Sequence, residues 1–225
     1  CGAKVACGAS ECAACRRPSV PMNRFDVWLE ALVWSFHGCR MRIGLGGCFF
    51  DVLRQVCGAF ARDYPRRDEL ERKERHYLCY ALTHVIYALN NFDERSLSPR
   101  LFPPTVPAFM REQLRLAIRE DDPDMAGELL DCLKCLGDGG EHITAAEGFL
   151  LASQSKADGG WVCKGEADLY SRYHASLVAV AALLDHSYVS DVPIFEAAQT
   201  VLPGWFEAPP PADADGAHAP PPPAP

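Results

Sequence analysis

The sequence lacks a hydrophobic run long enough to cross a membrane. A membrane-spanning helix needs about 20 consecutive, predominantly apolar residues. The longest apolar run, residues 175–184, covers about half of that length before an aspartate ends it. A charged start followed by a hydrophobic core and a small-residue cleavage site is also missing. We therefore expect no membrane span and read no secretory signal.

Positive charge is scarce relative to negative charge. The chain carries 22 Lys and Arg against 30 Asp and Glu, which gives a formal net charge of -8, and its arginines are scattered. A protein that binds phosphate backbones needs a basic face. The composition therefore predicts no nucleic-acid partner.

The two-residue alternation of β-strands is also missing between residues 22 and 207. Apolar residues recur there with the period of a helix, and residues 25–36 place Phe25, Leu29, Leu32 and Phe36 on one stripe. With 48% hydrophobic residues, the chain can bury a core of ordinary size. We predict one all-α domain over residues 23–207.

Glycine and proline divide this domain into helices with short links. Residues 77–89 are almost wholly apolar, which predicts an interior helix, whereas residues 109–119 mix apolar side chains with charged ones, which predicts an exterior helix. Serial alternation of outer and inner helices is typical of α/α solenoids and toroids. We therefore predict α/α hairpin repeats that form a partial or incomplete (α/α) toroid.

The two ends of the chain differ in composition from this domain. Residues 1–22 form a Cys/Ala-rich lead-in that we expect to be poorly ordered. Residues 208–225 are mostly proline and alanine with almost nothing to bury, which predicts a disordered tail that acts as a spacer.

Cysteine is frequent, but its pattern does not resemble a disulfide framework. The number of cysteines is odd, at 11, and Cys57, Cys79 and Cys132 lie within apolar helical runs. A cytoplasmic or other reducing compartment fits this pattern best. The cysteines in residues 7–15 are candidate zinc ligands. A structural zinc site needs four ligands in two close pairs, however, and no second pair lies nearby. The sequence does not favour zinc there.

The segment AAEGFLLASQSKADGGW, residues 145–161, contains a Gln, a Gly and a Trp at a distinctive spacing. It resembles the QW repeat of the squalene-cyclase and protein prenyltransferase superfamily. The Gln154 amide can bond backbone groups at a helix end, Gly159 lets the chain reverse, and the Trp161 indole can cover the joint and donate its N–H. We interpret these three residues as a structural staple. The resemblance implies an α/α toroid that acts on an apolar, isoprenoid-like molecule.

A second resemblance concerns residues 167–177, ADLYSRYHASL. They are similar to the start of an inner helix in protein prenyltransferase β subunits, where a Tyr-His pair opens the helix and the histidine binds zinc; the corresponding residue is His174. That family also uses an acidic residue two before a cysteine, but Tyr77 stands there before Cys79. A zinc prenyltransferase is therefore not favoured, and zinc remains only a candidate cofactor.

The acidic motif of the cyclases, Asp-x-Asp-Asp, is absent as well. The nearest acidic run is EDDPDMAGE, residues 120–128. It has the residues of a helix start, with Asp122 as N-cap, Pro123 at the first position and acids near the positive end of the helix dipole. We interpret this run as a helix start and not as a diphosphate-binding motif.

Candidate site residues carry imidazole, carboxylate or phenol groups on the predicted inner helices. Their spacing places those of each helix on one face, and the faces of inner helices converge at the centre of a toroid. Imidazole titrates near neutrality, and a carboxylate can accept its second N–H. We predict four catalytic candidates, His84, His174, Glu128 and Asp131, and four pocket residues, Tyr77, Tyr170, Tyr173 and Arg172. Alternatively, Arg172 forms a structural ion pair and Asp168 caps its helix.

Two functions stay open from the sequence. The first is a toroid protein that binds or transforms an apolar, isoprenoid-like small molecule in a central aromatic and histidine-lined pocket. The second is a noncatalytic helical scaffold that binds a protein partner, or that needs a second chain to complete the toroid. The two hypotheses differ in whether the four catalytic candidates point into one cavity.

Overall fold

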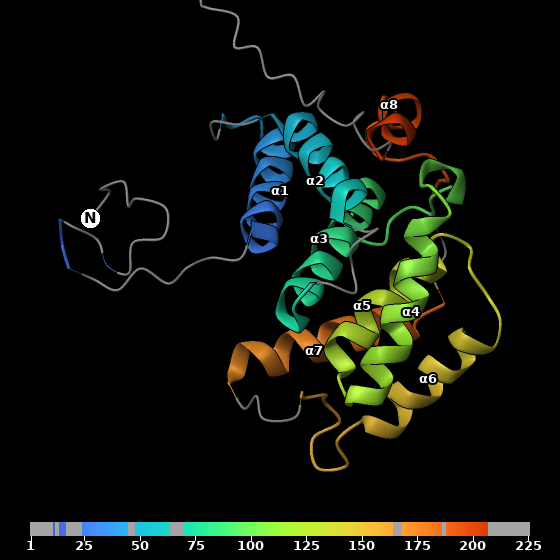
Figure 1. The fold of residues 1–225 in the computed structure, drawn as a ribbon. Helices are drawn as coiled ribbons and strands as arrows, with labels where there is room; N and C mark the ends of the chain where they lie inside the picture. The colour runs from blue at the N-terminus through green and yellow to red at the C-terminus, as the bar shows by residue number, and fades with distance from the viewer. Residues whose placement is uncertain are drawn as a thin grey trace, which may run out of the picture.

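The computed structural model describes residues 11, 14–16, 24–44, 48–63, 70–163, 168–185 and 188–206. These ranges contain helices and no β-strand, which confirms the all-α prediction. The helices are α1 (Arg24–Met41), α2 (Phe49–Asp63), α3 (Arg72–Asn90), the 3-10 helix η2 (Pro99–Leu101), α4 (Thr105–Glu120), α5 (Pro123–Cys135), α6 (Glu141–Ser153), α7 (Leu169–Leu183) and α8 (Ala198–Trp205) (Figure 1). Within the described ranges, no helix is long and apolar enough to cross a membrane.

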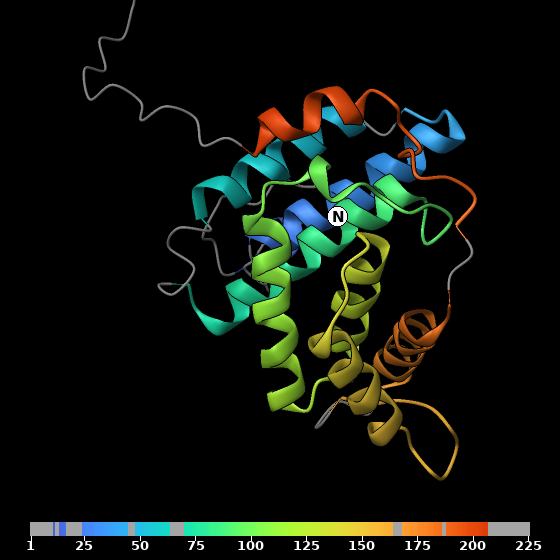
Figure 2. The same cartoon turned by 90° about the vertical axis from the view of Figure 1, so that its right-hand side faces the viewer.

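The helices pack in two series. The odd-numbered helices follow one another in space, with α1 on α3, α3 on α5 and α5 on α7. Among the even-numbered helices, α4 packs on α5 and α6, α2 packs on α1 and α3, and α8 lies against α2 and η2. Both views place α1, α2 and α8 toward one end of the molecule and α4 to α7 toward the other (Figures 1 and 2). This order fits an inner and an outer row, but a toroid stays a prediction.

Burial separates the interior helices from the exterior ones as the sequence suggests. In α3, the run from Leu78 to Asn90 is almost entirely buried, whereas α4 buries Phe109 and Leu114 and exposes Arg115 and Arg119. The central helix α5 is buried at nearly every position. Its start has the expected cap, because Asp122 Oδ1 accepts a hydrogen bond from the Met125 N–H at 3.1 Å.

The close contact between α5 and α7 depends on small residues. A Cβ atom on Gly127 would lie 2.9 Å from Val178 Cγ2 and 3.0 Å from the Ala179 backbone nitrogen. On the other side of the contact, α7 presents Ala175 and Ala182 toward the core. The two backbones can therefore approach closely, which brings the start of α7 beside the start of α5.

The opposite face of α7 is exposed, which differs from the prediction that this helix is interior. Its residues recur at helical spacing and form one apolar stripe, which we call the α7 stripe: Leu169, Tyr173, Leu177, Val180 and Leu184. A helix with apolar residues on both faces resembles an interior helix in sequence. In the described chain, only one of the two faces of α7 is covered.

The turn before α7 has the local contacts expected of a staple. The Gln154 amide donates to the Gly159 carbonyl at 2.7 Å, and the Trp161 indole N–H donates to the Leu150 carbonyl at 2.8 Å. Gly159 has a φ of 75°, in the region that favours glycine. Trp161 is buried, so these residues hold the end of α6 to the chain that leads into α7.

The remaining predictions concern the two ends of the chain and the cysteines. The tail that we predict to be disordered lies outside the described residues, as does the Cys/Ala-rich lead-in apart from residues 11 and 14–16. Cys7 and Cys12, two of the cysteines considered above as zinc ligands, also lie outside the described residues. The cysteines that the structure describes form no disulfide, and four of them are buried in helices: Cys57, Cys79, Cys132 and Cys135.

Candidate functional site

Three helices of the odd-numbered row bring titratable side chains together. Helix α5 contributes Asp124 and Glu128, α3 contributes Tyr80 and His84, and α7 contributes His174. Asp124 and Glu128 are four residues apart and therefore lie on one face of α5, between α3 and α7. The close packing of α5 against α7 places His174 within reach of both carboxyl groups.

His174 lies between two carboxyl groups. Its Nδ1 donates to Asp124 Oδ1 at 2.6 Å, and its Nε2 lies 3.5 Å from Glu128 Oε1. The Tyr80 hydroxyl donates to the second oxygen of Asp124, and Tyr170 stacks on the His174 ring at a centroid distance of 5.8 Å. The hydrogen bond to Asp124 is the main reason that the pKa of His174 is raised, while partial burial opposes it. This imidazole is therefore oriented by Asp124, and the same contact favours its protonated form.

Glu128 is a buried acid at the centre of the cluster. Its pKa is raised to about 8, mainly by burial; the charge of Asp124 acts in the same direction, while the hydrogen bond from Thr83 and the charge of His174 act in the opposite direction. Its side chain is only 1% exposed. At neutral pH most Glu128 carboxyl groups are consequently protonated, and the group can release or accept a proton close to that pH.

The pKa of His84 is shifted in the opposite direction to that of His174. The pKa of His84 is lowered to about 4, mainly by burial and in the same direction by the charge of His174, so the ring is neutral at pH 7. Its Nδ1 lies 2.9 Å from the Tyr80 carbonyl, which can only accept, so Nδ1 carries the proton. This tautomer leaves Nε2 as the unprotonated nitrogen. The cluster thus pairs an imidazole of lowered pKa with one of raised pKa.

Two adjoining cavities meet at these histidines. The first, which we call the polar chamber, has a volume of about 290 Å³ and is lined by Asp26, Leu29, Glu30, Tyr77, Tyr80, His84, Asp124, Tyr170, Ser171 and His174. The second, the apolar chamber, has a volume of about 280 Å³ and is lined by His84, Tyr87, Phe92, Asp93, Glu128, His174, Leu177, Val178 and Ala181. Both linings contain His84 and His174, so the two imidazoles lie at the boundary between the chambers.

The turn after α3 forms part of the apolar chamber in a strained conformation. Asn91, Phe92 and Asp93 have φ values of 59°, 52° and 70°. A non-glycine residue in this region costs about 1 to 2 kcal/mol, so three in succession store appreciable strain. Stacking of Phe92 on Tyr87 at a centroid distance of 5.9 Å helps to hold the turn. Such strain is common where a backbone must present side chains to a site.

The structure brings most of the predicted site residues to the chambers, but three lie elsewhere. Asp131 is buried one turn beyond Glu128 and lies in neither lining; burial is the main cause of its raised pKa of about 8, and a hydrogen bond to Asp93 adds to it. Tyr173 directly precedes His174, so it is turned by about 100° around α7 and points to solvent. Arg172 pairs with Asp158, as the alternative interpretation has it, and Asp168 caps α7.

The sequence interpretation missed Asp124 and Tyr80. Asp124 stands in the acidic run that we explained as a helix start, and it does lie in the first turn of α5. Its spacing of four residues from Glu128 was the available signal, because it places both carboxyl groups on one face. Tyr80 lies between Tyr77 and His84 on α3, and only the distance to Asp124 in the folded chain distinguishes it from its neighbours.

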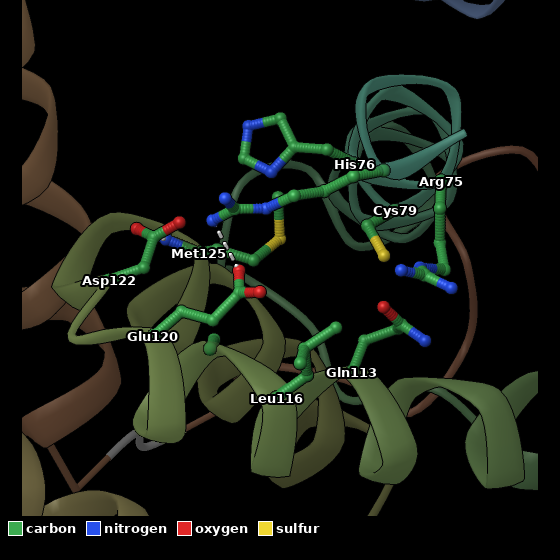
Figure 3. A pocket seen from close by; sticks show the side chains of 10 residues that line it. Arg75, His76, Cys79, Gln113, Leu116, Glu120, Asp122 and Met125 are labelled. Carbon is green, nitrogen blue, oxygen red and sulfur yellow. Dashed lines mark hydrogen bonds and ion pairs between the residues drawn. The ribbon is translucent and has the colours of Figure 1, made fainter.

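A separate cleft lies between α3 and α4. Figure 3 shows His76 and Cys79 of α3 facing Gln113 and Glu120 of α4, with Arg72 paired to Glu120 at 2.6 Å. Its volume of about 30 Å³ has room for little more than a water molecule. A wider depression of about 390 Å³ adjoins it, but there too acidic and basic side chains are mixed. The chambers at His84 and His174 are the better candidates for a ligand site.

Among the described residues, no three His, Cys, Asp or Glu side chains are grouped as a set that could hold a metal ion. His174 has its Nδ1 engaged by Asp124 and faces Glu128 with its Nε2. The described chain therefore presents these groups as a hydrogen-bonded acid–base cluster.

Comparison with known proteins finds no match for this chain among the models of protein families, the characterised proteins or the solved structures. Its function has to be inferred from the side chains of the site.

Proposed function

We propose that this chain is a divergent α/α-toroid protein that binds an apolar small molecule in the apolar chamber, with His174 and Glu128 placed to exchange a proton with it. The resemblance of residues 145–161 to a QW repeat and the serial packing of α1, α3, α5 and α7 support the toroid. An isoprenoid-like hydrocarbon fits the lining provided by Leu177, Val178 and Ala181.

The observation that carries the proposal is the position of the two imidazoles between the chambers. A ligand in either chamber contacts His84 and His174. Behind His174 lie an orienting partner, Asp124, and an acid whose pKa of about 8 suits proton transfer near neutrality, Glu128. Burying such a carboxyl group without a task is costly, which favours a functional role over a purely structural one.

The binding part of the proposal can be tested with a neutral fluorescent probe. We expect N-phenyl-1-naphthylamine to bind saturably to the wild-type protein with an increase in emission. Ala181→Phe fills the apolar chamber and should abolish this binding. Val180→Phe introduces the same ring on the neighbouring exposed position and should not affect it. Equal binding by both variants would place the probe elsewhere and contradict the proposal.

A noncatalytic scaffold is the second candidate, and the α7 stripe favours it. Five apolar residues on one exposed face offer a surface on which another helix can pack. In the proposed toroid this is where the row α1–α3–α5–α7 would continue, so a second chain could complete the ring there. Sedimentation of the wild-type protein and of Val180→Asp tests this idea: a self-associated species that the charge dissociates supports it, and a monomer in both cases opposes a second copy as the partner.

A further inference from the structure

The polar chamber carries an excess of negative charge. The carboxylates of Asp26, Glu30 and Asp124 line it, whereas His174 can contribute at most one positive charge and His84 is neutral. Among the lining residues of this chamber there is no lysine and no arginine. An anionic ligand would meet repulsion here, while a cationic group would balance the charge.

The aromatic rings of the chamber suit a cation as well. Tyr77, Tyr80 and Tyr170 belong to the lining, and the face of a tyrosine ring attracts ammonium groups. The ring of Tyr77 already engages one, since Lys73 Nζ lies 5.8 Å from its centroid. Burial is the main cause of the raised pKa of Tyr170, and the charge of Asp124 acts in the same direction.

A carboxyl oxygen at the boundary of the two chambers has no hydrogen bond within the described chain. Glu128 Oε1 is buried and lacks a hydrogen-bond partner, although it lies 3.5 Å from His174 Nε2. Glu128 also lines the apolar chamber. A polar group of a ligand that enters this boundary would satisfy it.

We propose that the polar chamber selects ligands that carry a protonated primary amine, and that the apolar chamber holds their hydrocarbon chain. This inference rests on the proposed function and specifies its substrate class as an amphipathic amine. The ammonium lies among the carboxylates and tyrosine rings of the polar chamber, at the boundary where Glu128 Oε1 has no hydrogen bond within the described chain. The chain passes His84 and His174 and ends against Leu177, Val178 and Ala181.

Competition for the neutral probe tests this selection. n-Octylamine, n-octanol and n-octanoate share one chain and differ in the charge of the head group. At pH 7 we expect the amine to displace the probe about tenfold more effectively than the alcohol, and the carboxylate to be weaker than both. Equal displacement by the amine and the alcohol, or stronger displacement by the carboxylate, would overturn the proposal.

Two matched variants locate the effect. Asp26→Asn removes a carboxylate of the chamber from the first turn of α1, and Asp51→Asn removes one from the first turn of α2, away from the chamber. The preference for the amine should fall about threefold in the first variant and stay unchanged in the second. Glu30→Gln provides a second neutralised position if Asp26→Asn does not fold.

The outcomes separate this inference from the proposed function. Binding of the probe with no preference for the amine, or a preference that neither Asp26→Asn nor Glu30→Gln reduces, leaves an apolar site and overturns amine selection. Failure of the probe to bind the wild-type protein contradicts the proposed function, and the inference then falls with it.

Discussion

His174 Nδ1 lies 2.6 Å from Asp124 Oδ1, and this contact joins α7 to the first turn of α5. Asp124 also accepts a hydrogen bond from the Tyr80 hydroxyl, so this one carboxylate links α3, α5 and α7. Two consequences follow for the cluster. The imidazole cannot rotate freely, and its Nε2 is directed toward Glu128.

Asp124→Asn should lower the pKa of His174, because the hydrogen bond to Asp124 is the main cause of its elevation. A group with a raised folded pKa stabilises the protein most below its unfolded value and loses this contribution as the pH rises through the folded value. The variant should therefore lose about 1 to 2 kcal/mol of unfolding free energy near pH 6, and less at higher pH.

The pKa of His174 can be followed by NMR titration of its Cε1 proton, with denaturation at several pH values beside it. Asp121→Asn is the control, since Asp121 is exposed at the end of α4 and lies outside the lining of both the chambers. An unchanged His174 pKa in Asp124→Asn would contradict the contact.

Glu128→Gln should change how stability depends on pH. The pKa of Glu128 is raised to about 8 by burial, so the folded state holds a proton that the unfolded state loses above pH 4.5. Wild-type stability therefore falls as the pH rises from 5 to 8 because of this group. The neutral amide removes that decline. From pH 5 to pH 8, the unfolding free energy of the variant should therefore rise relative to that of the wild type by an amount on the order of a few kcal/mol.

Urea denaturation of both proteins at pH 5 and pH 8 measures this difference directly. Asp131, whose pKa is also raised to about 8, contributes a similar slope to both proteins and does not obscure the comparison. Parallel pH profiles for the wild type and Glu128→Gln would show that Glu128 is ionised in the folded protein.

Gly127→Ala tests the close approach of α5 and α7. The added Cβ would lie 3.0 Å or less from Val178 and Ala179, including backbone atoms that cannot turn aside. We expect the free energy of unfolding to fall by about 1 to 3 kcal/mol and the His174–Asp124 contact to weaken. Gly148→Ala in α6 meets nothing within 4 Å and should gain about 0.5 to 1 kcal/mol. Thermal unfolding distinguishes the two, and equal effects would argue against tight packing at Gly127.

Trp161→Phe tests the staple. The change keeps an aromatic ring at a buried position but leaves the Leu150 carbonyl without the indole N–H, which should cost about 1 to 2 kcal/mol. Trp34→Phe removes an indole N–H that bonds Glu30 on the exposed face of α1, and it should change stability by less than about 0.5 kcal/mol. Similar losses in both variants would contradict a structural role specific to Trp161.

The helical class, the interior run of α3 and the start of α5 were the parts of the fold that the sequence could predict. The apolar run of residues 77–89 is interior in α3, and Asp122 and Pro123 start α5 as capping preferences suggest. The exposure of the α7 stripe could not be predicted, because an apolar face looks the same in sequence whether or not another helix covers it.

The candidate site was predicted in part. Helical spacing and the order of the helices placed His84, His174 and Glu128 together. Asp131 was misplaced because the turn at Asp93 covers the end of α5, a contact between distant segments. Asp124 was overlooked because one residue can serve a helix start and a side-chain cluster together, and a local capping pattern explains only the first of these.

The central claim is that a ligand bound in the chambers contacts both boundary histidines. The most direct test is NMR of the histidine Cε1 protons during titration with N-phenyl-1-naphthylamine, whose rings shift nearby protons. We expect saturable shifts of His84 and His174, while His142, which pairs with Asp138 and lines neither chamber, stays unchanged. Saturable binding of the probe without a shift of His84 or His174 would contradict the claim.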